Sequence, residues 1–202
     1  MHTGAMPASD VVALLAITLD GYVARTDGSV DFLDAHPVPE FDFDAFTDGV
    51  DGLIMGRSTY EQVVTFGWPW GERLTTVLTS QADLDVPADA NVRFVAQPTA
   101  DAIRAHTAEC KQRLWVVGGG KVVTDGILGG AIDTLDLMVI PEAIGSGIPL
   151  FTAAISGPLR LVRTTPYPGG AVRLVYDLTD AWATDCRPAH PFSRSVRRHG
   201  RR

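Results

Sequence analysis

The sequence predicts an α/β domain in which a mostly parallel sheet carries helices on both faces and ends in an antiparallel hairpin. Residues 11–18, "VVALLAIT", form a nearly all-apolar run, as expected of a strand that is buried on both faces. Apolar strands then alternate with helical stretches, which favours parallel pairing. Residues 159–178 alternate apolar and charged side chains around Gly169 and Gly170, a pattern typical of a hairpin.

The remaining elements follow in order along the chain. A long acidic loop over 19–40, with turn signals at Asp20-Gly21 and Asp27-Gly28, separates the first strand from a short helix at 41–49. Later helices are expected from Ser58, over 99–112 and after the glycines at 118–120, the second with an apolar stripe of Ala102, Ile103, His106 and Cys110. Further strands are expected at 52–55, 73–80, 91–96, 113–117 and 133–141.

Length and charge indicate one soluble domain with a distinct tail. The 202 residues carry a net charge of −7, with 46% hydrophobic and 20% charged residues. Residues 181–202 hold six arginines against one aspartate, a charge of about +5, which leaves about −12 for the rest. We expect a domain at 10–180 between a disordered N-terminus, 1–9, and a disordered basic tail, 181–202. The acidic body argues against a nucleic-acid partner.

Cysteine usage and targeting signals favour a cytoplasmic protein without a metal. Cys110 and Cys186 form neither a CxxC motif nor a cluster with the five scattered histidines. The start, "MHTGAMPASD", lacks the basic and apolar regions of a secretion signal. No apolar run approaches the ~20 residues needed to cross a bilayer, so no membrane partner is expected.

The first of two glycine turns lies in "LIMGRSTYE", residues 53–61. Gly56 ends an apolar strand, and Ser58 with Glu61 fits a capping box that opens a helix. A helix start directs free N–H groups and a positive dipole end at whatever lies above the strand, and Arg57 adds a forked cation suited to phosphate. The alternative is a capped surface helix with a solvated arginine.

The second glycine turn is "VVGGGKVV", residues 116–123, which also follows a strand and opens a helix. It is neither the Rossmann fingerprint, because Val123 stands where Gly or Ala is required, nor a P-loop, because Val122 follows Lys121. Tight helix–strand packing is the alternative to phosphate binding. Both turns lie at the carboxyl ends of strands, where open α/β sheets bind ligands.

Two other chemistries lack their residues. A serine nucleophile elbow needs a second glycine where Tyr60 stands, and none of the later histidines, His106, His190 and His199, is placed as a triad base. A zinc deaminase needs H-x-E and P-C-x-x-C, and neither motif is present.

Six segments in a fixed order carry a family resemblance over about residues 10–178. They are "AITLDGYVA", "DGSVDFL", "VDGLIMGRSTYE", "VLTS", "WVVGGGKV" and "LDLMVIPEAIGSGIPLF". The chain resembles the dihydrofolate reductase-like superfamily, and within it the stand-alone branch related to the reductase domain of the bifunctional riboflavin-biosynthesis deaminase-reductase. The resemblance implies that fold and an NADPH-dependent reductase.

The resemblance also implies the cofactor residues. Gly56, Arg57, Ser58 and Thr59 would hold NADPH phosphates, Thr79 and Ser80 would meet the adenosine side, and the second turn would lie against the pyrophosphate and nicotinamide. The residues of that turn are Gly118, Gly119, Gly120, Lys121 and Val122. Ala16 and Val23 would flank the nicotinamide, although small apolar residues also fill sheets.

The substrate side departs from the pattern of true dihydrofolate reductases. Their single carboxylate, which supports protonation of the pterin, corresponds here to a window that holds Glu40, Asp42 and Asp44, and spacing does not choose among them. A proton donor needs a raised pKa in an apolar pocket, whereas neighbouring acids are also common at solvated helix starts. The candidate substrate-binding residues are Asp31, Phe32 (in place of the branch's loop tryptophan) and Trp68, which with Trp70 could instead cover the core edge.

The function expected is hydride transfer from NADPH to a C=N or similar carbon of a small heterocycle. A pteridine and a ribosylamino-pyrimidine both remain open as substrates, and a nucleotide-binding module without turnover is the alternative. The irregular apolar stretch "VIPEAIGSGIPLF" and the dimers typical of the related branch predict a homodimer with Ile144, Ile148, Leu150 and Phe151 at or near the contact. Leu150 and Phe151 could instead close the monomer core.

Overall fold

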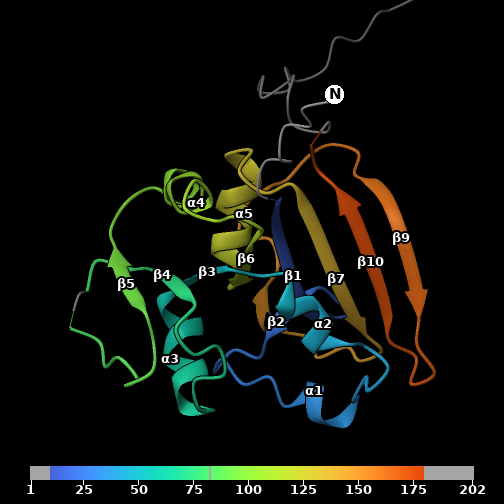
Figure 1. The fold of residues 1–202 in the computed structure, drawn as a ribbon. Helices are drawn as coiled ribbons and strands as arrows, with labels where there is room; N and C mark the ends of the chain where they lie inside the picture. The colour runs from blue at the N-terminus through green and yellow to red at the C-terminus, as the bar shows by residue number, and fades with distance from the viewer. Residues whose placement is uncertain (1–9, 82, 180–202) are drawn as a thin grey trace, which may run out of the picture.

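A computed structural model describes residues 10–81 and 83–179, and these form one eight-stranded sheet with helices on both faces (Figure 1). The strand order is β5-β4-β3-β6-β1-β7-β10-β9. The strands are β1 (Asp10–Thr18), β3 (Gly52–Gly56), β4 (Leu74–Leu78), β5 (Val92–Val95), β6 (Arg113–Gly118), β7 (Thr134–Ile140), β9 (Arg160–Pro166) and β10 (Val172–Asp177). The predicted α/β class is confirmed.

The first six strands of this order pair in parallel, and the hairpin adds the antiparallel part. β1 lies between β6 and β7, with Val12 opposite both Trp115 and Thr134. β10 then pairs antiparallel with β7 and with β9. The predicted turn between the two hairpin strands is confirmed, because the Gly170 amide donates to the Tyr167 carbonyl and Gly170 has a φ of 87°.

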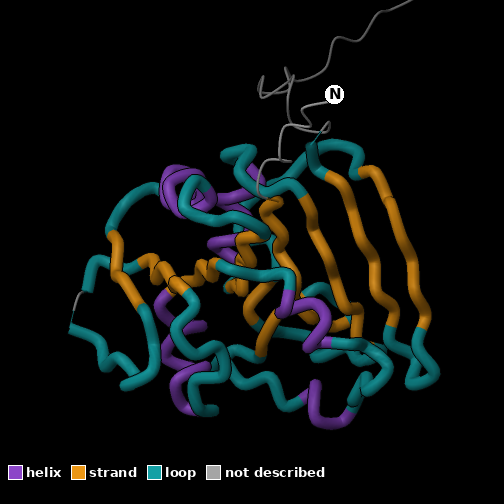
Figure 2. Tube along the Cα trace, viewed as in Figure 1, coloured by secondary structure: helices purple, strands orange, loops and turns teal. Residues whose placement is uncertain are grey.

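Helices cover both faces of the sheet, as predicted (Figure 2). Apolar residues of α4 (Thr99–Thr107) and α5 (Gly120–Leu128) pack on one face, around Val11, Ile54 and Leu114. Residues of α2 (Phe43–Asp48) and α3 (Arg57–Thr65) pack on the other face, around Leu53 and Trp115. Each face therefore has its own apolar core.

Two segments that the sequence pattern treats as irregular pair with each other. The loop after β1 contains β2 (Tyr22–Ala24) and the short helix α1 (Phe32–Ala35). β2 pairs antiparallel with β8 (Ile148–Pro149). Turns form at both predicted positions, where Gly21 and Gly28 have φ values of 86° and 89°. The expectation of a structureless 19–40 loop was wrong because its partner strand lies more than a hundred residues away.

The helix predicted over 99–112 is shorter than expected. α4 ends at Thr107, and Cys110 lies beyond it. The Asp51 carboxylate accepts hydrogen bonds from the backbone N–H groups of Lys111 (2.6 Å) and Gln112 (3.1 Å). These two N–H groups therefore bond to a side chain and do not continue the helical hydrogen bonds of α4. The predicted apolar stripe holds within the helix, since Ala102, Ile103 and His106 are buried.

Leu150 does not lie at a surface. Leu150 is buried in the core that α4 and α5 cover. The backbone just after it is held by Thr124, whose hydroxyl accepts the N–H of Thr152. Its assignment to a dimer contact is therefore corrected: Leu150 closes the monomer core, as the alternative expected. Ile148 and Phe151 are each 38% exposed. The segments predicted to be disordered, 1–9 and 181–202, lie outside the described residues, as do residues 82 and 180.

Candidate active site

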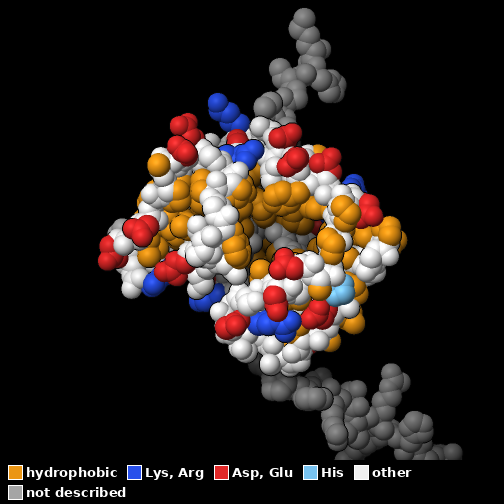
Figure 3. Space-filling model, turned by 90° about the horizontal axis from the view of Figure 1, so that it is seen from below, with side chains coloured by type: hydrophobic (Ala, Val, Ile, Leu, Met, Phe, Trp, Pro, Cys, Tyr) orange, Lys and Arg blue, Asp and Glu red, His pale blue; other side chains and the backbone are white. Residues whose placement is uncertain are grey.

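A cleft of about 1450 Å³ opens at the carboxyl ends of the parallel strands. Its lining includes Ala16 of β1, Gly56 of β3, Gly118 of β6 and Met138 of β7. Seen from this end, hydrophobic side chains line a hollow whose rim carries both acidic and basic groups (Figure 3). Open α/β sheets bind ligands at this end, so the cleft is the candidate active site.

The first predicted glycine turn forms one wall of the cleft. Gly56 is the N-cap of α3, and Arg57, Ser58 and Thr59 follow it in the lining. The predicted capping box is absent: the N-cap is Gly56, two residues before Ser58, and it makes no side-chain hydrogen bond. Glu61 instead accepts from Arg57 Nε at 2.8 Å. The first N–H groups of α3 are therefore not satisfied by a side-chain cap.

The second predicted glycine turn forms the facing wall. Gly118 and Gly119 are joined by a cis peptide bond, and Gly118 has a φ of 139°, which side chains other than hydrogen disfavour. α5 begins at Gly120 with Gly119 as its N-cap, again without a side-chain cap. At Gly120, a Cβ would lie 2.2 Å from the Pro149 carbonyl oxygen, so that position requires glycine for packing.

The two turns lie next to each other in the cleft lining. A Cβ built on Gly118 or Gly119 would meet only Thr59 Oγ1, at 3.8 and 3.5 Å. The glycines thus let the two uncapped helix starts approach each other closely in the cleft lining, with Arg57 and Lys121 beside them. We call this region, residues 56–59 and 118–122, the glycine half of the cleft. Backbone N–H groups, helix dipoles and two cations suit phosphate groups.

The other predicted cofactor residues lie in two places. Ala16 and Val23 line the cleft itself. Thr79 and Ser80 line a smaller depression of about 400 Å³, which shares Leu78 with the cleft and is therefore adjacent to it. The structure thus brings all but these two predicted cofactor residues into one cavity.

Aromatic side chains form the rest of the cleft, a feature that the sequence analysis missed. Phe41, Phe43 and Trp115 line it, with ring centroids 6.3 Å apart for the two phenylalanines and 5.7 Å for Phe43 and Trp115. We call this group, with Met138, the aromatic half of the cleft. The Trp115 indole N–H donates to the Leu14 carbonyl at 3.0 Å, which fixes its ring.

A largely buried ion pair, Arg173–Asp136, packs against the aromatic half at Phe41. The Arg173 guanidinium lies 4.9 Å from the centre of the Phe41 ring and makes two hydrogen bonds to Asp136, at 2.8 and 2.6 Å. The hydrogen bond to Asp136 raises the pKa of Arg173. A bidentate pair of this kind fixes the guanidinium plane and so the position of Phe41.

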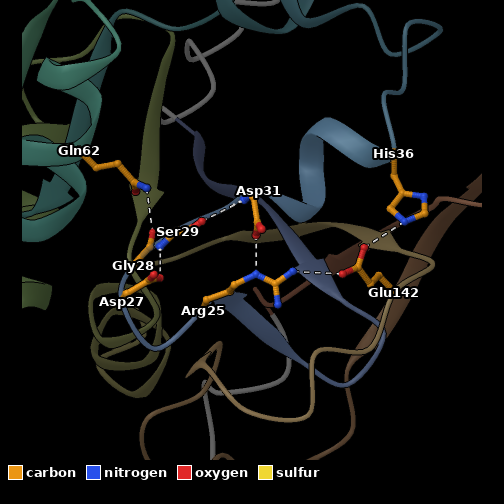
Figure 4. Close-up of polar contacts among 8 residues, drawn as sticks. All are labelled: Arg25, Asp27, Gly28, Ser29, Asp31, His36, Gln62 and Glu142. Carbon is orange, nitrogen blue, oxygen red and sulfur yellow. Dashed lines mark hydrogen bonds and ion pairs between the residues drawn. The ribbon is translucent and has the colours of Figure 1, made fainter.

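The segment 25–31 bridges the cleft between α3 and the chain after β7 (Figure 4). On one side, the Gln62 amide donates to the Gly28 carbonyl at 2.8 Å. On the other, Arg25 pairs with Asp31 and with Glu142. The hydrogen bond from Arg25 holds the pKa of Asp31 below its usual value, so this predicted substrate-binding carboxylate is ionised near neutral pH.

The structure does not bring the remaining predicted substrate and catalytic residues into the cleft lining. Phe32 is buried beneath it, and Trp68 packs against Tyr60 and Trp70. The three candidate acids are exposed and lie outside the lining; the Asp42 carboxylate accepts the Ala45 N–H at 2.8 Å and so caps α2. These acids are Glu40, Asp42 and Asp44.

The described residues contain neither a metal-binding cluster of three residues nor a helix able to span a membrane. Over 10–81 and 83–179, His, Cys, Asp and Glu side chains form no group of three that could hold a metal ion. Within the same ranges, every helix is too short or too polar to cross a membrane.

Comparison with known proteins identifies the family. The family model for dihydrofolate reductase matches residues 41–142. An uncharacterized Bacillus subtilis protein, YwjB, is 36% identical over 82% of this chain and 95% of its own length.

Solved structures share the fold. A putative riboflavin biosynthesis protein from Shewanella sp. PV-4 superposes with a TM-score of 0.70 at 25% identity, over 83% of this chain and 98% of its own. The Enterococcus faecalis dihydrofolate reductase, solved in complex with NADP(H), has a TM-score of 0.62 at 20% identity, over 84% and 96%. The sheet order, the two facing glycine turns and these matches lead to one conclusion: the chain belongs to the dihydrofolate reductase family.

Proposed function

We propose that this protein is an NADPH-dependent reductase of a small heterocyclic substrate. The observation that carries the proposal is the pair of uncapped helix starts, α3 and α5, whose glycine turns lie close together in the lining of one cleft. The likeness to a reductase solved with NADP(H) supports the same assignment.

The glycine half would bind the cofactor. The N–H groups at the starts of α3 and α5, with Arg57 and Lys121, would hold its phosphates, and Thr79 and Ser80 would meet its adenosine end. Both cations now pair with an acid four residues later, Glu61 and Asp125, and these exposed pairs are weak enough to exchange for phosphate.

The nicotinamide would then lie against Ala16 and Val23, beside the aromatic half. When bound, the cofactor supplies a hydride from its nicotinamide ring. The protein's own contribution is to place the substrate ring against it and to exclude water around it, by the walls that Phe41, Phe43 and Trp115 provide. Asp31 would lie at the edge of the bound substrate.

A homodimer is proposed with Ile144, Ile148 and Phe151 near the contact. Ile148 and Phe151 expose apolar surface next to the paired β2 and β8 strands. Light scattering at micromolar concentration tests the assembly: we expect twice the 21.6 kDa chain mass, and a mass near 21.6 kDa would refute the dimer.

Steady-state assays test turnover. Loss of absorbance at the NADPH band is measured with a panel of pteridines and ribosylamino-pyrimidines, and oxidation that depends on one of them is the expected result. The second candidate function, a nucleotide-binding module, is favoured by the position of Glu40, Asp42 and Asp44 outside the cleft lining. Tight NADPH binding without oxidation by any substrate would establish the module and refute the reductase.

A further inference from the structure

Two ligand atoms meet at the amino end of the sheet, at the opposite end from the cleft. His106 lies in the last turn of α4, and Cys110 follows three residues after that helix ends. A Cβ built on Gly52, the first residue of β3, would lie 2.8 Å from His106 Nε2 and 2.5 Å from Cys110 Sγ. The imidazole nitrogen and the sulfur therefore converge on one point beside Gly52. Leu114 Cδ1, at 3.1 Å from the same point, adds an apolar neighbour.

The imidazole of His106 is fully buried without a polar partner. Within the described chain, neither Nδ1 nor Nε2 has a hydrogen-bond partner. Burial lowers the pKa of His106 to about 4, with Arg93 acting in the same direction, so the ring is neutral near pH 7. One nitrogen of a neutral imidazole carries a lone pair that can bind a metal ion. An unused polar group in the interior costs free energy, which a bound ligand would offset.

The sulfur of Cys110 is the second ligand atom. The side chain is half-buried, and burial raises the pKa of its thiol to about 12. The charge and the hydrogen bond of Asp51 act in the same direction, as does Glu109, whereas Arg93 opposes them. The thiol is therefore protonated near pH 7 and unreactive toward ordinary electrophiles. A metal ion that coordinates the sulfur displaces this proton.

The number of ligand atoms separates the metal ions that favour sulfur and imidazole. Zinc(II) and copper(I) both bind thiolate and imidazole, but zinc(II) takes at least three protein ligands. The described residues offer no group of three that could hold a metal ion. Asp51 already uses Oδ2 to accept the N–H groups of Lys111 and Gln112. Copper(I) binds stably to two ligands in a linear arrangement, so this pair of atoms suits it.

We propose that His106 Nε2 and Cys110 Sγ form a two-coordinate site for copper(I). On binding, the S–H bond breaks, the proton leaves to solvent, and one Cu–S and one Cu–N bond form. Neither copper nor sulfur changes its oxidation state. The ion replaces a proton of equal charge, so this buried region gains no uncompensated charge, whereas a divalent ion would add one. The site lies outside the cleft and is independent of the proposed reductase function.

Copper(I) titration of the full chain tests the site. Ascorbate keeps the metal as copper(I) under nitrogen, and the protein competes for it with the coloured chelator bicinchoninate. We expect one copper(I) retained per chain, with a thiolate-to-copper absorption band in the ultraviolet. Failure of the wild type to retain copper would refute the site. An excess of zinc(II) should not displace the bound ion, and displacement would refute the preference for a monovalent metal.

Three variants locate the bound ion. Cys110→Ser should abolish copper retention, and His106→Gln should weaken it about tenfold or more, since even an outer partner of a metal site contributes that much. Cys186→Ser is the matched control, because Cys186 is the chain's other cysteine and lies outside the described residues. This control should bind copper as the wild type does. Copper kept by Cys110→Ser, or lost by Cys186→Ser, would overturn the proposal.

A measurement on the control protein covers the case in which Cys110→Ser does not fold. Copper(I) bound to the native site should raise the unfolding midpoint of Cys186→Ser, because only the folded chain brings His106 and Cys110 together. The midpoint is followed by circular dichroism with and without copper(I). An unchanged or lowered midpoint would contradict the site.

Discussion

The two ends of the parallel sheet differ in whether their unpaired polar groups face an open cleft or the protein interior. At the carboxyl end, the helix starts at Gly56 and Gly119 have no side-chain caps and face an open cleft. At the amino end, the side chain of His106 on α4 packs against Gly52 and is fully buried, and neither of its ring nitrogens has a hydrogen-bond partner. Unused polar groups at the open end can bind a ligand, whereas those at the sealed end affect stability.

The largest expected effect comes from acidifying the sealed end. Burial lowers the pKa of His106 from 6.5 to about 4, with nearby Arg93 acting in the same direction and Glu109 and Asp51 opposing it. Because the unfolded chain binds the proton more readily, stability is complete above pH 6.5 and falls as the pH drops toward 4, by about 3 kcal/mol. Urea unfolding at a series of pH values measures this loss.

His106→Gln provides the control for that titration. Its glutamine does not titrate, so the fall between pH 6.5 and 4 should become shallower than in the wild type. Parallel pH profiles for the two proteins would show that His106 does not carry the effect.

Removing a cation from the open end should leave stability unchanged and weaken binding. Arg57 is 43% exposed, and its pair with Glu61 contributes little to folding. Arg57→Ala should weaken NADPH binding by ~1.5–3 kcal/mol, as for a hydrogen bond to a charged group. Calorimetric titration measures the change. Arg163→Ala, on the exposed strand β9, is the matched control. Equal NADPH affinity in the two variants would show that Arg57 is a solvated surface residue and does not contact the cofactor.

A methyl group at the second glycine turn should act on packing. In Gly120→Ala, the new Cβ would lie 2.2 Å from the Pro149 oxygen and 2.8 Å from that of Leu150. The resulting overpacking should lower the free energy of unfolding by about 1–3 kcal/mol. Gly49→Ala is the control, since its nearest contact would be an ordinary 3.7 Å. A Gly120→Ala protein as stable as Gly49→Ala would mean that Pro149 and Leu150 do not pack on α5 as described.

The smallest effect is expected from loosening the segment that bridges the cleft. Arg25→Ala removes both ion pairs of a partly exposed side chain, so the free energy of unfolding should change little. The pKa of Asp31 should rise toward its ordinary value, because the hydrogen bond from Arg25 is its main perturbation. NMR titration of the Asp31 carboxyl carbon measures the shift, and an unchanged pKa would rule out this pairing in solution.

Local patterns predicted the sheet and the glycine half of the cleft well. The apolar run at 11–18 and the strand-to-helix glycines each depend on a few adjacent residues, and the order of such segments along the chain carried the family resemblance. The β2–β8 pair and the burial of Leu150 depend on contacts between distant segments, which no local pattern encodes.

The aromatic half likewise depends on contacts between distant segments, which local sequence patterns do not predict. Phe41 and Phe43 lie far in sequence from Trp115, and only the sheet brings the three together. The prediction of a capping box was wrong for a more local reason: the helix cap lies two residues earlier than predicted, at Gly56, and Glu61 accepts a hydrogen bond from Arg57. The exact residue at which the helix starts depends on how the whole turn packs, and the sequence motif holds no information about that packing.

The central claim, that the open end of the sheet binds NADPH, is tested most directly by one titration. NADPH is added to the wild-type protein at neutral pH, and energy transfer from tryptophan to the bound nicotinamide is recorded. We expect saturable binding of one NADPH per chain, which NADP+ competes away. A signal that rises without saturation, or that NADP+ leaves unchanged, would contradict it.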